Sequence, residues 1–196
     1  MITQQLLEKA MNYPQYKNLQ EDLMAQGKTT GDNQSEEYIH YTKINLQRMH
    51  RLEKTTVIDQ SLKLALSKKT NTYVLLAITE GWCGDAAQNL PVFHALENEL
   101  KNVELKLVLR DEHLELMDQY LTNGSRSIPK IICVDKATLK ELFVWGPRPA
   151  ALQEIVLQLK KENMSHEEKG LVTQNWYNAD KTKSLQAEIL NLVRSF

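Results

Sequence analysis

Apolar residues recur along the chain with two different periods, which predicts alternating helices and strands. After Ser35, a favourable N-cap, apolar positions between residues 39 and 49 are spaced by three or four, as on one face of a helix. Residues 73–78 form a continuous apolar run too short for a surface helix, so we expect a buried central strand there. Residues 103–109 alternate between leucine or valine and polar positions, which is typical of a second strand.

The same reading predicts the order of elements along the whole chain. We expect two short helices within 4–26, helices at 36–54 and 58–66, a strand at 73–78, a helix at 85–101, a strand at 103–109, a helix at 112–121, strands at 130–134 and 139–144, and a helix ending near 161. This order indicates an α/β fold with a mixed sheet and helices on both faces. We expect a helical N-terminal extension over 1–69, a central domain over 70–161 and a helical tail over 162–196.

Composition narrows the class of protein. The chain has 196 residues, of which 42% are hydrophobic and 25% charged, typical of a globular protein with one sizeable core. A net charge of -1 provides no basic field for a phosphate backbone, so we expect no nucleic-acid partner.

Membrane association and export are not expected either. The apolar run at 73–78 is far shorter than the ~20 residues that span a bilayer, and Glu8 and Lys9 interrupt the region where a signal peptide is apolar. Two cysteines, Cys83 and Cys133, fit a reducing compartment. We therefore expect a cytoplasmic protein.

Three motifs in order along the chain carry a family resemblance. Residues 80–91 read EGWCGDAAQNLP, with a Trp-Cys-Gly triplet opening a helix and Pro91 eight residues after Cys83; residues 124–129 read GSRSIP; and Gly146 follows the last strand. Over residues 70–160 the chain resembles the thioredoxin superfamily. As a whole it is similar to bacterial thioredoxin-like proteins that have a Trp-Cys-Gly-Asp-Ala motif and a helical N-terminal extension.

The resemblance implies a thioredoxin-like fold and a site around one cysteine. It implies that Pro129 follows a cis peptide bond and faces Cys83, the candidate catalytic residue. It also implies a binding groove whose residues are Trp82, Gly84, Asp85, Ile128 and Pro129. No cofactor is implied, and because the five histidines lack metal-ligand spacing we expect no metal site.

Two departures from the family pattern affect the same chemical step. Ala86 replaces the second cysteine, and Ala77 replaces the buried acid that precedes the first cysteine by six residues. A dithiol enzyme releases its product when the second thiol attacks the mixed disulfide. This chain could therefore perform only the first half of that reaction.

The chemistry of Cys83 has two interpretations. At the N-terminus of a helix a thiolate is stabilised, which predicts a pKa below the free value of about 8.5. Asp85 should offset part of that effect by like-charge repulsion, although its simplest role is that of a helix N-terminal residue favoured by the dipole. The alternative is that Cys83 remains in a binding groove without a redox cycle.

Other residues have structural interpretations that we weigh above functional ones. Cys133 lies four residues along a strand from Pro129, about 13 Å at 3.3 Å per residue, whereas a disulfide needs Cα atoms within about 7 Å. We therefore expect Cys133 to be a core residue. Tyr38, Tyr41 and Met49 are expected to pack against the central domain rather than to line a ligand pocket. Arg148 is expected in a turn, with exposure near the site as the functional alternative.

Two classes of function follow. One is monothiol exchange, in which Cys83 forms a mixed disulfide with a protein or with a low-molecular-weight thiol that then resolves it. The other is a binding module that holds an extended peptide. Iron–sulfur binding has little support because no Gly-Gly-x-Asp-like segment follows Pro129.

The missing second thiol generates a test. The natural chain should be inactive as a disulfide reductase with thioredoxin reductase, whereas Ala86→Cys places a thiol at i+3 from Cys83 and should permit a disulfide and slow turnover. Turnover should stay slow because Ala77 supplies no general base, an assistance worth about 10² to 10⁴-fold. Ala77→Asp in that background should raise the rate. Reductase turnover by the natural chain at the level of a dithiol enzyme would contradict this account.

Overall fold

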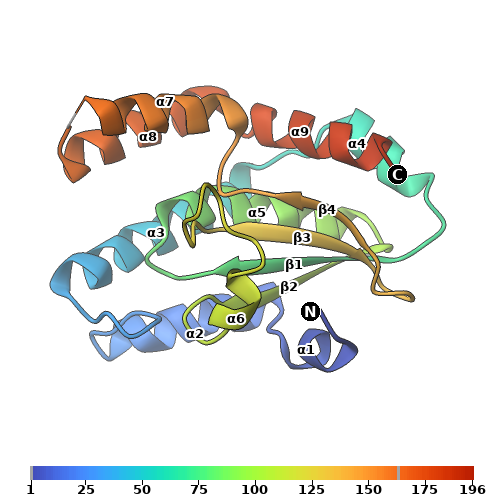
Figure 1. The fold of residues 1–196 in the computed structure, drawn as a ribbon, viewed down its shortest axis with the longest axis horizontal. Helices are drawn as coiled ribbons and strands as arrows, with labels where there is room; N and C mark the ends of the chain where they lie inside the picture. The colour runs from blue at the N-terminus through green and yellow to red at the C-terminus, as the bar shows by residue number, and fades with distance from the viewer. Residues whose placement is uncertain (1, 163) are drawn as a thin grey trace.

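The central sheet has four strands in the order β2-β1-β3-β4 in the computed structural model, which describes residues 2–162 and 164–196 (Figure 1). The strands are β1 Tyr73–Thr79, β2 Val103–Leu109, β3 Lys130–Asp135 and β4 Glu141–Trp145. β1 pairs with β2 in parallel and with β3 antiparallel, and β3 pairs antiparallel with β4. The predicted mixed sheet is confirmed.

Helices surround this sheet on both faces and along both edges. They are α1 Gln4–Lys9, α2 Tyr13–Ala25, α3 Glu36–Thr55, α4 Gln60–Ser67, α5 Gly84–Glu99, α6 Leu114–Met117, α7 Ala150–Lys161, α8 His166–Asp180 and α9 Lys183–Arg194. In Figure 1, α3 and α5 lie behind the sheet, α4, α7, α8 and α9 run along the β4 side, and α1 and α2 run along the β2 side. The predicted fold class and the helical segments at both ends are confirmed.

The helix predicted at 112–121 is shorter than expected. Beyond Met117 the backbone bonds switch to i to i−3 pairs, from Gln119 to Leu116 and from Tyr120 to Met117. The chain then reverses at Asn123 and Gly124, both with positive φ. A tighter last turn followed by left-handed residues ends the helix early.

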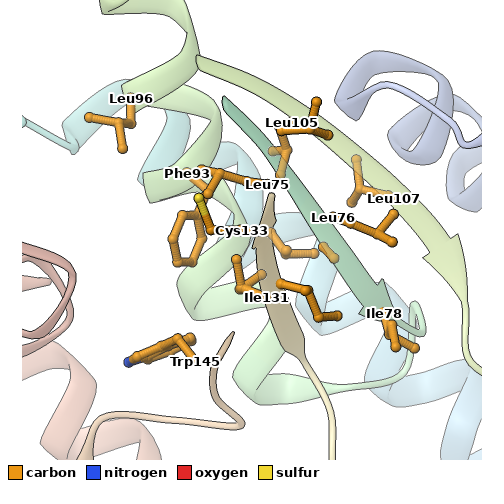
Figure 2. Packing of buried hydrophobic residues seen from close by; sticks show 14 of the residues in the cluster. Leu75, Leu76, Ile78, Phe93, Leu96, Leu105, Leu107, Ile131, Cys133 and Trp145 are labelled. Atoms are coloured by element: carbon orange, nitrogen blue, oxygen red, sulfur yellow. The ribbon is translucent and has the colours of Figure 1, made fainter. Parts of the chain in front are cut away.

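β1 lies at the centre of the core because it is covered on both faces. All seven of its residues are buried. Figure 2 shows Cys133 of β3 packed among Leu75, Phe93 and Ile131, which confirms its expected role as a core residue. Phe93 of α5 meets Trp145 of β4 edge to face, with ring centroids 5.8 Å apart, so the middle of the helix that carries the site is held against the sheet.

The N-terminal segment packs on the free edge of β2. Met11 and Leu107 exchange two backbone hydrogen bonds of 2.9 and 2.8 Å, which protects an edge that is otherwise open to pairing with another chain. Tyr16 and Met49 are each 1% exposed. Helices α2 and α3 are therefore part of the main core.

Gly146 lies where two loops of the site come into close contact. It has a φ of +117°, and a Cβ atom at this position would lie 2.2 Å from the carbonyl oxygen of Pro129. Only glycine combines this backbone conformation with so close an approach. The turn after β4 is thereby fixed against the loop that precedes β3.

We expect Gly146→Ala to be strongly destabilising, because backbone strain and overpacking each cost about 1 to 3 kcal/mol. Gly170→Ala is the matched control: Gly170 lies in the middle of α8 with no atom near the new Cβ, so alanine there should stabilise by roughly 0.5 to 1 kcal/mol. Urea unfolding measures both changes. Equal effects of the two substitutions would contradict the close approach at Gly146.

Candidate functional site

Cys83 lies at the junction between β1 and α5. It is the N-cap residue of α5, and its backbone N–H donates to the carbonyl of Glu80 at 3.1 Å, closing the turn over residues 80–83. Gly84 follows at the first helical position, with Arg48 of α3 beside it: the guanidinium would lie 3.4 Å from a Cβ at residue 84. The predicted position of Cys83 at a helix N-terminus is confirmed.

The thiol of Cys83 is enclosed by protein. The residue is 8% exposed, and its Sγ donates a weak hydrogen bond to the carbonyl of Ile128 at 3.3 Å. The peptide bond between Ile128 and Pro129 is cis, as predicted, and both residues are buried. The structure therefore brings together the cysteine and the proline loop that the motifs indicated.

The expected lowering of the Cys83 pKa is wrong. Burial raises the pKa of this thiol to about 12, and the nearby Asp85 carboxylate raises it further. The backbone N–H groups of Ala86 and Asp85 and the guanidinium of Arg148 act in the opposite direction with smaller effects. The helix N-terminus does stabilise the thiolate, but loss of solvent outweighs it.

Asp85 and Arg148 form a mostly enclosed ion pair. Two guanidinium nitrogens of Arg148 donate to one carboxylate oxygen of Asp85, at 3.0 and 2.5 Å, and their side chains are 17% and 11% exposed. Arg148 also donates to Gln153 at 3.1 Å. Asp85 lies in the first turn of α5 and Arg148 in the turn after β4, as expected, and the structure adds the ion pair that joins them.

A tyrosine from the C-terminal segment completes this cluster. Tyr177 of α8 donates its hydroxyl hydrogen to the second carboxylate oxygen of Asp85 at 2.8 Å and accepts a bond of 3.0 Å from Asn89. Burial, and secondarily the Asp85 charge, raise the pKa of Tyr177 well above its usual value, so the hydroxyl stays protonated. The sequence contains no signal that links Tyr177 to Asp85, because they are 92 residues apart.

Trp82 lies next to the cysteine between an aromatic ring and a cation. Its ring is 4.6 Å from that of Tyr38, and the guanidinium of Arg110 lies 4.8 Å above it. Its indole N–H is buried without a hydrogen-bond partner among the described residues. Trp82 itself is partly exposed and presents a rigid apolar surface beside the site.

The protein has a buried acid, but it does not lie at position 77, where the family resemblance places one. Position 77 in β1 is occupied by a buried alanine. The buried acid is Glu80, which follows the strand and has no exposed surface. Burial raises the pKa of Glu80, and its carboxylate accepts a bond from the backbone N–H of Asp111 at 2.9 Å. Glu80 was not predicted from the sequence; the only signal was a carboxylate two residues after the apolar run at 73–78.

The N-terminal helices supply polar partners beneath this turn. Asn45 of α3 donates to the carbonyl of Gly81 at 2.9 Å, and Thr30 accepts from its N–H at 2.8 Å. Tyr16 of α2 shares a hydrogen bond of 3.3 Å with Thr79. Both polar groups of the Gly81 peptide are thus satisfied from outside the sheet.

No second thiol is close to Cys83. The position of a second thiol on the first turn of α5 is occupied by Ala86, which is 1% exposed. Cys133 is a free cysteine in β3, within the core of the sheet. Within residues 2–162 and 164–196, no three His, Cys, Asp or Glu side chains gather in a way that could hold a metal ion. No helix of the described chain is long and apolar enough to cross a membrane.

A family model described as Thioredoxin matches residues 31–168, which is more than half of the chain. The chain belongs to the thioredoxin family. This thioredoxin-like protein matches no curated protein.

Solved structures share its fold. A protein of unknown function from Pseudomonas aeruginosa superposes with a TM-score of 0.65 at 15% identity, covering 100% of this chain and 99% of that chain. An HIV epitope scaffold superposes with a TM-score of 0.65 at 14% identity, covering 98% and 97%. At these identities the likeness shows the fold, helical segments included, and the function has to be argued from the site.

Proposed function

We propose that this thioredoxin-like protein is a binding module that holds an extended segment of a protein partner beside Trp82 and the Ile128–Pro129 loop, without redox turnover at Cys83. The observation that carries the proposal is the state of the thiol: Cys83 is buried, and its S–H donates a hydrogen bond to the Ile128 carbonyl. A thiol must be deprotonated and accessible to attack a disulfide.

The remaining features of the site suit binding better than exchange. Trp82, held between Tyr38 and Arg110, is a large side chain that loses little entropy when it packs on a ligand. The adjacent Ile128–Pro129 loop precedes β3, whose two edges pair with β1 and β4, so a partner segment would lie across this loop and Trp82 rather than extend the sheet. Aromatic anchors of this kind often dominate the energy of an interface.

Monothiol exchange is the second candidate, supported by a specific observation. The N–H groups of Asp85 and Ala86 and the Arg148 guanidinium favour a thiolate at Cys83. Its sulfur would attack a disulfide, form a mixed disulfide and release one thiolate. A thiolate of a second molecule would then attack the mixed disulfide and restore Cys83.

One binding experiment separates the two candidates. Peptides selected from a random-sequence library on the natural protein are measured against Cys83→Ala, Trp82→Ala and Tyr38→Ala, with Val57→Ala as control because Val57 is 78% exposed and far from the site in sequence. We expect Trp82→Ala and Tyr38→Ala to weaken binding by roughly tenfold or more. Cys83→Ala and Val57→Ala should bind within about threefold of the natural protein.

Loss of capture in Cys83→Ala, with retention in Trp82→Ala, would favour exchange over binding. A library that yields no peptide dependent on Trp82 would contradict the binding proposal. Urea midpoints of the variants show whether any loss reflects unfolding.

A further inference from the structure

Helix α8 is attached to the protein by few contacts. Tyr177 is its one buried side chain among those described, and Leu171 is 63% exposed. With α7 it encloses a small apolar cluster separate from the main core, formed by Leu152, Val156 and Tyr177 with Ile155 and Trp176 at its margin. Figure 1 shows α7 and α8 side by side at one end of the molecule.

The contacts of α8 with the rest of the protein are mainly polar and concentrate on the first turns of α5. Tyr177 bonds Asp85 and Asn89, and Gln174 accepts from Gln88 at 2.9 Å. Nearer the C-terminus of α8, Arg51 of α3 donates to Asn178 at 3.2 Å at an exposed position, and Asp180 accepts from Ser184 of α9. Hydrogen bonds exchange readily with water, so a helix held in this way opens more easily than one held by apolar burial.

The neighbouring helix α9 is held differently. Leu185, Ile189 and Val193 are each 1% exposed within the main core. Between α8 and α9, Lys181 and Thr182 have φ values of +51° and +67°. Such values are uncommon for residues other than glycine and unfavourable for the β-branched Thr182. A strained junction therefore separates a firmly packed helix from a loosely attached one.

We infer that α8 is a displaceable cover of the Cys83 end of α5, latched by the hydroxyl of Tyr177 on Asp85. Cys83 is the N-cap residue of the same helix, two residues before Asp85, and Arg148 binds the carboxylate that Tyr177 holds. When α8 leaves, Asp85 and Arg148 gain solvent, and the turn that contains Cys83 becomes open to a reagent. This regulation of access holds whether Cys83 is a nucleophile or part of a binding groove.

The test uses the full chain and the alkylation of Cys83 by iodoacetamide, read by mass spectrometry of its peptide. Tyr177→Phe removes the latch but keeps the ring. The matched control is Tyr13→Phe, because Tyr13 also donates a bond of 2.9 Å to a carboxylate, that of Glu53, from a buried position in α2. Both variants lose one hydroxyl–carboxylate bond, Tyr177→Phe loses in addition the bond from Asn89, and only Tyr177 lies on α8.

We expect Tyr177→Phe to speed alkylation of Cys83 by roughly 5- to 30-fold, since the rate follows the population of the open form. Tyr13→Phe should change it by less than about twofold. The increase cannot come from the thiol itself, because removing a donor from Asp85 strengthens the carboxylate's effect in raising the Cys83 pKa and slows the reaction.

Hydrogen exchange supplies a second readout: amides of residues 166–180 should exchange faster in Tyr177→Phe, with those of α9 unchanged. Equal acceleration by the two variants would show that the thiol reacts only through global unfolding, and an unchanged rate in Tyr177→Phe would show that α8 does not cover it. Either result overturns the inference, and neither depends on whether a peptide binds at Trp82.

Discussion

The first turn of α5 is packed by protein on several sides, and its polar groups therefore need partners from within the chain. The carboxylate of Asp85 accepts hydrogen bonds from Arg148 and Tyr177. The side chain of Asn89 donates both to Tyr177 and to the carbonyl of Asp85. The thiol of Cys83 has, among residues 2–162 and 164–196, only a backbone carbonyl as acceptor. Because a buried charge is costly without a strong partner, desolvation keeps the proton on sulfur even at a helix N-terminus.

The partners of this turn come from both ends of the chain. α3 and the loop that precedes it satisfy the backbone of Gly81, and α3 places Tyr38 on Trp82. α8 and the turn after β4 satisfy Asp85. The helices outside the sheet therefore determine the environment of the cysteine, and the sheet itself provides its position and the facing proline loop.

The elements and the proline loop could be predicted from the sequence because their signals are local. An apolar run, an N-cap before a spaced apolar face, and a Gly-x-Arg-x-Ile-Pro segment each act over a few residues, and β1, α3 and the cis bond before Pro129 were all found as predicted. The domain boundaries at residues 69 and 161 remain a prediction. The predicted length of α6 was wrong because the end of this helix depends on a turn rather than on the spacing of apolar residues.

The electrostatics of the site could not be predicted in the same way. The pKa of Cys83 depends on burial by residues distant in sequence, and the helix dipole, the one local signal, acts in the opposite direction. The ion pair of Arg148 was not predicted because its partner Asp85 is 63 residues away, and Tyr177 carries no motif. Such long-range polar contacts follow from the packed structure, since each partner alone is an ordinary surface residue type.

The central claim is that Cys83 carries its proton at neutral pH in the folded protein. The most direct measurement is the ¹³Cβ chemical shift of Cys83 as a function of pH, assigned by comparison with Cys83→Ala. We expect no titration of this resonance up to about pH 10, well above the free thiol value of about 8.5. A transition centred near or below pH 8 would show a stabilised thiolate and contradict the account.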